Sequence, residues 1–131
     1  MIGYSLVGTD DLERAAEFYD GIFDVIGTRR ALVVPGRMVA WGAIWKEPHF
    51  GVVRPFDEQP ARAGNGAMVA LRADSRDLVD ALHAKALASG AADEGGPGLR
   101  GPDPNGFYGA YFRDLDGNKL CVFRYGPGEV G

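Results

Sequence analysis

Two stretches of the chain carry apolar residues at the spacing of an α-helix. In residues 10–27 the apolar positions recur three or four residues apart, and in residues 75–90 they do so again. The apolar stripes consist of Leu12, Ala15, Ala16, Tyr19, Ile22, Phe23 and Ile26 in the first stretch and of Val79, Leu82, Ala86 and Leu87 in the second. Asp10 and Asp74 are the expected N-caps, and a glycine follows each stripe. The pattern predicts two helices, over residues 10–27 and 75–90.

Shorter runs of β-branched, aromatic and other apolar residues, separated by glycine, proline and polar residues, predict strands. These runs cover residues 2–9, 29–36, 37–45, 50–56, 66–74, 106–114 and 118–126. The stretch 91–105 is rich in glycine and proline, and we expect a long loop there with room for one short strand.

The turn Asp114–Gly117 joins the last two predicted strands into a hairpin. Aspartate followed by glycine favours a type I turn with Gly117 in the left-handed conformation. This turn would place Tyr111 opposite Cys121, whereas a two-residue turn would place Phe112 there. An aromatic side chain is therefore expected beside the only cysteine of the chain in either case.

The predicted elements occur twice in the same order, a strand, a helix and then three strands. The two expected caps are 64 positions apart, and near the ends of the two units an offset of 70 relates Gly51 to Cys121. We therefore interpret the chain as an α+β protein of two tandem βαβββ modules. Module one covers residues 1–57, a linker covers 58–65, module two covers 66–126 and a tail covers 127–131.

The size and charge of the chain argue against several classes of function. With 131 residues, one compact domain is expected. The net charge is −4 and no cluster of lysine and arginine occurs, so nucleic acid is not an expected partner. No apolar run approaches the roughly 20 residues that span a bilayer, and no basic n-region opens the chain, so neither a membrane partner nor a signal peptide is expected. A single cysteine cannot form an internal disulfide, which fits a cytoplasmic location.

Residues 8–20, 55–100 and 105–123 resemble the vicinal oxygen chelate superfamily, which includes glyoxalase I, bleomycin-resistance proteins and extradiol dioxygenases. The resemblance rests on the two capped helices, on the sequence AGNG at 63–66 and on the hairpin sequence DLDGNK at 114–119. It implies paired βαβββ modules whose strands curl around a cavity, with the helices outside. It also implies that the protein is a homodimer.

The resemblance further implies where a metal ion would bind. In metal-using members, a histidine early in the first strand of a module and a glutamate in its last strand are ligands. The resemblance aligns these positions with Tyr4 and Gly51 in module one and with Met68 and Cys121 in module two. Glycine has no ligand atom, a thioether is soft, and one thiolate does not make a site. We therefore expect no metal and no other cofactor.

Alternation along the predicted strands assigns one set of side chains to the cavity. The set consists of Tyr4, Met68, Arg72, Tyr111, Cys121 and Phe123 beside Gly51, with Trp41 or Trp45 as a further member. Aromatic and apolar groups around one arginine suit a small, partly apolar or aromatic ligand with an anionic or carbonyl group. The two histidines are expected at the surface, His49 at a strand edge and His83 near the outer face of the second helix.

Three functions stay open at this point. We favour a protein that binds such a molecule without a metal. A metal-independent lyase or isomerase would use Tyr4 as acid or base and Cys121 as nucleophile or proton donor. An apolar site raises a thiol pKa, however, and no base is evidently directed at Cys121. A metal-dependent lyase, isomerase or dioxygenase would need ligands recruited from elsewhere in the chain.

Overall fold

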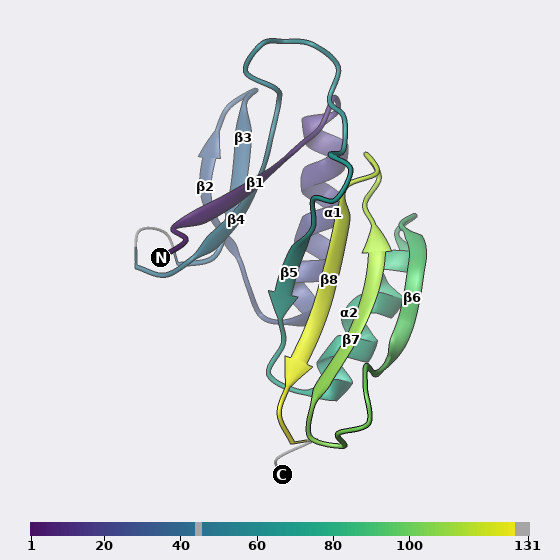
Figure 1. Cartoon of the computed structure of the whole chain (residues 1–131). Helices are drawn as coiled ribbons and strands as arrows, with labels where there is room; N and C mark the ends of the chain where they lie inside the picture. Colours follow the sequence, from purple (N-terminus) through teal and green to yellow (C-terminus); the bar gives the residue numbers. More distant parts are fainter. Residues whose placement is uncertain (44–45, 128–131) are drawn as a thin grey trace.

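The first half of the chain forms a mixed sheet with one helix. The computed structural model describes residues 1–43 and 46–127. The elements of the first half are β1 (Tyr4–Gly8), α1 (Leu12–Val25), β2 (Arg30–Val34), β3 (Met38–Trp41) and β4 (His49–Val53). The strands lie in the order β1-β4-β3-β2, and β1 is parallel to β4 while the other pairs are antiparallel (Figure 1).

The second half repeats this arrangement. Its elements are β5 (Val69–Arg72), α2 (Arg76–Ala88), β6 (Ala92–Leu99), β7 (Phe107–Arg113) and β8 (Lys119–Tyr125). The strand order is β5-β8-β7-β6, again with one parallel pair, β5 and β8 (Figure 1). Two helices and two four-stranded mixed sheets confirm the predicted fold of two βαβββ units. The two sheets do not close into a barrel.

The N-cap of each helix lies one residue later than the sequence pattern predicts. The N-caps are Asp11, whose side chain accepts from the amide of Arg14, and Ser75, whose hydroxyl accepts from the amide of Leu78. The assignment of Asp10 as a cap is wrong because its carboxylate accepts instead from the amide of Ala61 in the linker. Asp74 is likewise displaced as a cap by the following serine. Asp11 and Ser75 keep the spacing of 64, so the repeat itself is unaffected.

The stretch after α2 contains a full strand where a loop was expected. β6 spans 8 residues and pairs with β7, but its register shifts between Asp93 and Gly95 and again between Gly95 and Gly98. Its sequence has no alternation of apolar residues, so periodicity could not reveal it. The edge of β7 supplies hydrogen-bonding groups that a glycine-rich segment can follow with bulges.

The turn after β7 has the longer of the two predicted forms. The amide of Asp114 donates to the carbonyl of Asn118, and Gly117 has a φ of 88°. In the resulting register Tyr111 lies opposite Cys121. The prediction from a type I turn with a left-handed glycine is therefore confirmed, and the alternative with Phe112 opposite the cysteine is wrong.

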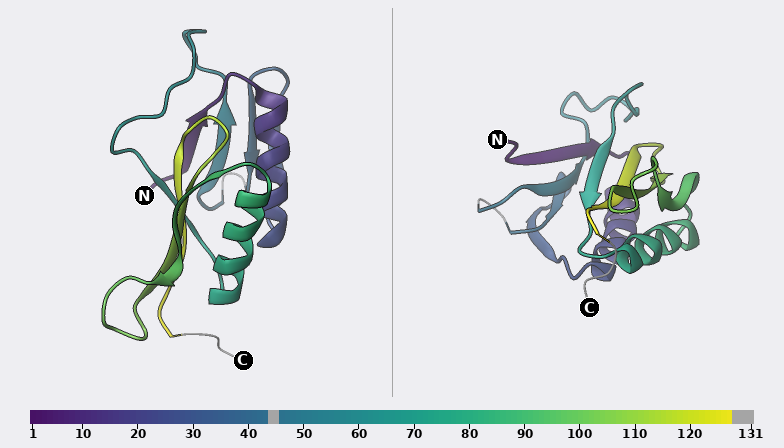
Figure 2. Two further views of the ribbon diagram at one scale, coloured as in Figure 1. Left: turned by 90° about the vertical axis from the view of Figure 1, so that its right-hand side faces the viewer. Right: turned by 60° about the horizontal axis from the view of Figure 1, so that its bottom comes forward.

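The two helices lie on the same side of both sheets and contact each other (Figure 2). Alternate strand residues point toward them and form one core across both halves, including Val52, Leu71, Leu120 and Val122. The opposite side of each sheet carries no helix (Figure 2). We call this side the open face; its residues include Tyr4, Leu6, His49, Gly51, Met68, Arg72, Tyr111, Lys119, Cys121 and Phe123. Within the described residues no helix is long and apolar enough to cross a bilayer.

A buried polar network joins the two halves. The hydroxyl of Tyr19 in α1 donates to Asp114 Oδ2 at 2.5 Å, and Asn118 Nδ2 donates to the carbonyl of Gly8 at 2.9 Å. Asp114 Oδ1 also accepts from the amides of Asp116 and Asn118. Because every polar group of this cluster has a partner, its burial does not carry the cost of an unsatisfied polar group. The network holds the β7–β8 hairpin of the second half against β1 and α1 of the first half.

Candidate functional site

Two of the predicted site residues are prominent on the open face. Tyr4 at the start of β1 is 52% exposed, and Met68, directly before β5, is 46% exposed. The ring of Tyr4 stacks on His49, with 5.1 Å between ring centroids and an interplanar angle of 22°. His49 is buried beneath this contact, so its assignment as a surface histidine is wrong. The cause is the parallel pairing of β1 with β4, which places Tyr4 directly beside His49.

The position of Gly51 is covered by a neighbouring leucine. Gly51 lies opposite Leu6 in the parallel pair of β1 and β4. A Cβ added at Gly51 would lie 2.8 Å from Leu6 Cδ2 and 3.1 Å from the carbonyl oxygen of Val39. A larger side chain therefore cannot occupy this position unless Leu6 moves. Leu6 was absent from the predicted site because only the strand register reveals its contact with Gly51.

Cys121 is completely buried in the middle of β8. Its strand neighbours are Ala70 on β5 and Tyr111 on β7. Burial raises the pKa of the Cys121 thiol, whereas the neighbouring Tyr111 side chain and the charges of Arg100 and Lys119 act to lower it. Burial is the largest of these effects, so the group is a neutral thiol at neutral pH.

Tyr111 lies beside two cations that the sequence did not connect with it. The guanidinium carbon of Arg100 lies 5.4 Å from the centroid of the Tyr111 ring, and the ammonium of Lys119 lies 5.6 Å from it. Burial and the neighbouring Cys121 raise the pKa of Tyr111, while Arg100 lowers it. Arg100 was missed because it follows a segment that was interpreted as a loop. Lys119 stands two residues before Cys121, and alternation alone places it on the same face.

The remaining predicted residues have different surroundings. Arg72 ends β5, is exposed, and pairs in register with Phe123. Phe123 stacks on Phe107, with 5.2 Å between centroids and an interplanar angle of 8°. Because Leu71 and Val122 belong to the core on the helix side, alternation leaves Arg72 and Phe123 on the open face.

Trp41 does not lie on the open face. It is buried in the core against Tyr19, Phe23 and Phe50, and its indole nitrogen donates to Asp20 Oδ1 at 2.9 Å. Its expected role as a cavity residue is therefore wrong, because the pairing of β3 with β4 turns it toward α1. The alternative member, Trp45, falls outside the described residues.

His83 is buried as well, contrary to the prediction for the outer face of the second helix. Its Nε2 lies 3.2 Å from Asp93 Oδ1, and its ring meets Phe112 edge to face. β6 and β7 cover this side of α2, and the unpredicted length of β6 explains the difference. His83 belongs to the helix-packed layer and not to the open face.

The four positions aligned with metal ligands do not fit a metal ion. Tyr4 is stacked on His49, Gly51 lies under Leu6, Met68 offers a thioether, and Cys121 has a raised pKa. Hard and borderline divalent ions require carboxylate, imidazole or thiolate ligands in a set of three or more. Among residues 1–43 and 46–127 no group of three histidine, cysteine or acidic side chains is close enough to hold an ion.

A hollow of about 210 Å³ lies between the facing edges of β1 and β5. Leu6 and Met68 supply apolar walls, and Arg62 from the linker and Lys119 from β8 supply the charges. Lys119 also contacts the ring of Tyr111, so this one residue lies both at the hollow and beside the Cys121 region of the open face.

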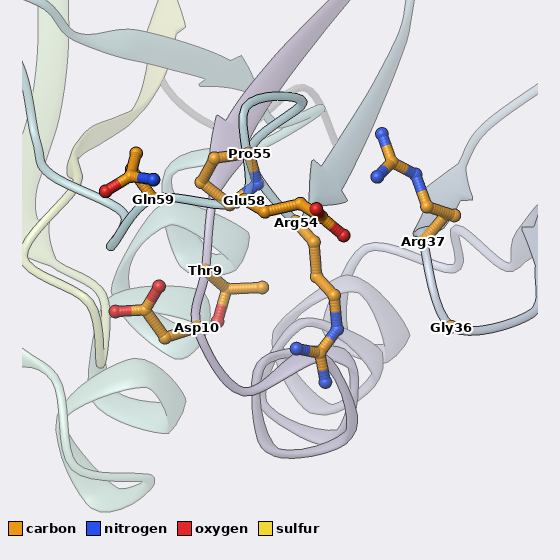
Figure 3. A pocket seen from close by; sticks show the side chains of 8 residues that line it. All are labelled: Thr9, Asp10, Gly36, Arg37, Arg54, Pro55, Glu58 and Gln59. Carbon is orange, nitrogen blue, oxygen red and sulfur yellow. The ribbon is translucent and has the colours of Figure 1, made fainter.

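A second hollow, of about 190 Å³, lies where β1 and β4 end and α1 begins (Figure 3). It is lined by Thr9, Asp10, Gly36, Arg37, Arg54, Pro55, Glu58 and Gln59. Two arginines and two acidic residues share this space, so its charges balance. It has no lining residue in common with the open face.

Comparison with known proteins gives a consistent result. The sequence model of the Glyoxalase/Bleomycin resistance protein/Dioxygenase superfamily matches residues 2–122 of the chain. A crystal structure of a glyoxalase/bleomycin resistance protein from Albidiferax ferrireducens T118 is 34% identical, with a TM-score of 0.82, covering 94% of this chain and 97% of the other.

More distant structures share the same fold. A hypothetical protein from S. aureus is 25% identical with a TM-score of 0.68, covering 92% of this chain and 90% of the other. A lactoylglutathione lyase from Agrobacterium tumefaciens is 24% identical with a TM-score of 0.64, covering 94% and 92%. No protein with a curated description is significantly similar to the chain.

Proposed function

Because the chain belongs to the glyoxalase/bleomycin resistance protein/dioxygenase superfamily, we propose that its open face binds a small, partly apolar or aromatic molecule without a metal ion of the family's type. The observation that carries the proposal is the hollow between β1 and β5, which has Leu6 and Met68 as walls. Both side chains are more than 40% exposed on a face that no helix covers. Concave apolar surface beside a few polar groups is typical of ligand sites.

The donor chemistry of the open face supports binding without a metal. Leu6 blocks the position of Gly51, and the thiol of Cys121 is held neutral by burial. The test is elemental analysis of protein purified after growth with added Ni²⁺, Fe²⁺, Mn²⁺ and Zn²⁺. We expect less than about 0.1 mole of any of these metals per mole of protein chain. A stoichiometric metal would contradict the proposal and favour an enzyme with ligands from elsewhere in the chain.

Binding itself is tested with neutral and anionic aromatic probes. We expect 2-naphthamide and 2-naphthoate at millimolar concentration to show saturation-transfer NMR signals with the wild-type protein. Leu6→Ser should weaken both signals because it removes an apolar wall of the hollow. Val33→Ser is the matched control, since Val33 is an exposed apolar residue that does not line the hollow. Absence of signals from both probes would contradict the proposal.

The alternative of a metal-independent lyase or isomerase has less support. Tyr4 contacts His49, whereas Cys121 contacts Tyr111 on the other sheet. A nucleophilic thiol requires a lowered pKa or an adjacent base, and burial raises the pKa of Cys121. If an activity is found, an unchanged rate in Tyr4→Phe and Cys121→Ala would rule this alternative out.

We also propose that the protein is a homodimer. The resemblance implies this state, and Ile2 and Tyr4, which do not line the hollow, are exposed apolar or aromatic residues that a second copy could cover. Isolated apolar residues on a surface are normal, but a contiguous group is typical of an interface. Light scattering should give twice the mass of one chain, and a monomer at micromolar concentration would contradict the proposal.

A further inference from the structure

We propose that the open face of the second sheet holds an oxyanion, a carboxylate or a phosphate, between Arg100, Lys119 and Tyr111. The inference rests on the proposed function, because it assigns the anionic part of the molecule that the open face binds. Two cations within 6 Å of the same aromatic ring carry it. An arginine fork and a lysine point charge are the usual partners of carboxylate and phosphate groups.

Arg100 is held in place by the glycine-rich strand β6. Its Nη1 donates to the carbonyl of Gly98 at 2.9 Å, and its Nη2 donates to the carbonyl of Gly96 at 2.8 Å. A Cβ added at Gly95 would lie 3.3 Å from Nη2, and one at Gly98 would lie 3.3 Å from Nη1. The absence of side chains at Gly95 and Gly98 therefore lets the guanidinium lie against the strand.

The same contacts leave part of the guanidinium available. A guanidinium carries five N–H donors, and the two carbonyls of β6 take two of them. The guanidinium lies over the Tyr111 ring, with its carbon 5.4 Å from the ring centroid, and its other donors take part in none of the side-chain hydrogen bonds found in the described residues. Because the backbone positions the fork before any ligand arrives, an oxyanion would meet a pre-ordered donor set, which lowers the entropic cost of binding.

The charges at this site are not neutralised within the described part of the chain. The ion pairs in residues 1–43 and 46–127 join Arg30 to Asp20, His83 to Asp93 and Arg113 to Glu94. Neither Arg100 nor Lys119 takes part in any of them. Arg113, which shares the open face of β7, is neutralised by its partner Glu94, so it does not compete for the ligand. A local positive field on a chain with a net charge of −4 favours an anionic ligand.

Lys119 links the oxyanion site to the apolar hollow. Its side chain lines the hollow beside Leu6 and Met68, and its ammonium contacts the Tyr111 ring. A molecule with its apolar part in the hollow would present its anionic group to Lys119 and Arg100. The expected ligand class is therefore an aromatic or branched apolar carboxylate or phosphate ester.

The test compares probes of the same shape with and without a charge. Isothermal titration or NMR titration should show 2-naphthoate binding at least several-fold more tightly than 2-naphthamide. Arg100→Gln should weaken 2-naphthoate about tenfold, which is the scale of one charge-assisted hydrogen bond, and should leave 2-naphthamide within about twofold. Arg100→Lys keeps the charge but not the fork, so an intermediate affinity is expected.

The control variant is Arg54→Gln, which makes the same charge change in the hollow of Figure 3. It should leave the affinity of 2-naphthoate unchanged, and circular dichroism should show that both glutamine variants remain folded. 2-Naphthyl phosphate and inorganic phosphate, titrated in parallel, distinguish a phosphate site from a carboxylate site by their relative affinities. Tighter binding of either the carboxylate or the phosphate probe supports an oxyanion site, provided that Arg100→Gln weakens that probe and leaves 2-naphthamide unchanged.

Two results would overturn the inference, and they differ in what else they overturn. If 2-naphthoate and 2-naphthamide bind equally and Arg100→Gln changes neither, the anion site is wrong while binding to the open face stands. If neither probe binds the wild-type protein, the proposed function fails, and the inference fails with it. Equal weakening of both probes by Arg100→Gln would show a structural effect and would also overturn the anion site.

Discussion

Replacing Tyr19 by phenylalanine tests the buried network that joins the two halves of the protein. Tyr19 is fully buried, and its hydroxyl donates to Asp114 Oδ2 at 2.5 Å. The substitution deletes only the hydroxyl, because the ring packs against Phe18, Phe23 and Trp41 in either variant. Asp114 keeps its bonds from the amides of Asp116 and Asn118 and from the Asn118 side chain.

The magnitude follows from the charge and burial of the acceptor. A hydrogen bond to a charged group contributes about 1.5–3 kcal/mol, and the partner left behind is buried. Since Asp114 keeps three of its four donors, we expect Tyr19→Phe to lower the free energy of unfolding by about 2 kcal/mol. For a chain of this length that loss corresponds to a decrease in Tm of about 5–10 °C.

The assay is urea unfolding followed by tryptophan fluorescence, with Tyr108→Phe as the matched control. The Tyr108 hydroxyl donates to Asp80 Oδ1 at 2.6 Å, so the same pair of groups interacts there at the surface. The surface substitution should change the free energy of unfolding by no more than about 0.5 kcal/mol. Equal losses in the two variants, or a loss below that limit in Tyr19→Phe, would refute the argument from burial.

Alkaline pH gives a second readout of the same residue. Burial, then the charge of Asp114 and the hydrogen bond to it, raises the pKa of Tyr19 well above that of an exposed tyrosine. The unfolded chain therefore releases this proton first, and the folded state loses stability as the pH rises above about 10. As the pH rises from neutral to above about 10, the Tyr19→Phe variant should lose less stability than the wild type. An identical alkaline loss in both proteins would show that Tyr19 does not contribute to it.

Three further predictions concern other parts of the structure. Cys121 should react with iodoacetamide at least a hundredfold more slowly in the native protein than in urea, as an order of magnitude, because its thiol is buried and its pKa is raised; mass spectrometry measures this cleanly with a single cysteine, and equal rates would contradict it. Gly51→Ala should destabilise the protein by about 1–2 kcal/mol through its contact with Leu6, and Leu6→Ala in the same chain should recover part of the loss; additive losses in urea unfolding would refute the contact. The hydrogen bond from Arg30 lowers the pKa of Asp20, so the pair stabilises the fold above the ordinary carboxyl pKa and loses this contribution as the pH falls through the lowered value; Asp20→Asn should flatten this acid limb of a Tm–pH curve, and an unchanged limb would exclude the pair as its origin.

The sequence predicted those parts of the fold that depend on neighbouring residues. Apolar spacing located both helices to within two residues at each end, and the turn residues of the last hairpin predicted the pairing of Tyr111 with Cys121. The repeat of the element order predicted two βαβββ units. Helical periodicity and turn chemistry are local, so a single sequence contains them.

Contacts between distant segments could not be predicted in the same way. The glycine-rich strand β6 has no periodicity, and pairing with β7 forms it. Its presence buries His83 and brings Arg100 to the Tyr111 ring. The burial of Trp41 in the core likewise depends on pairing between distant segments. The pairing of β3 with β4 decides on which side of the sheet the Trp41 side chain lies.

The candidate site illustrates this division most clearly. The sequence by itself predicted that Gly51 and Cys121 are equivalent positions of the two modules, and it determined that neither residue is acidic. Only the tertiary structure decided what occupies the space around them, which is Leu6 over Gly51 and Tyr111 with its two cations beside Cys121. The residue type at a position is written in the chain, but the neighbours of that position are set by strand register, because one shift of register exchanges every side chain between the two faces of a sheet.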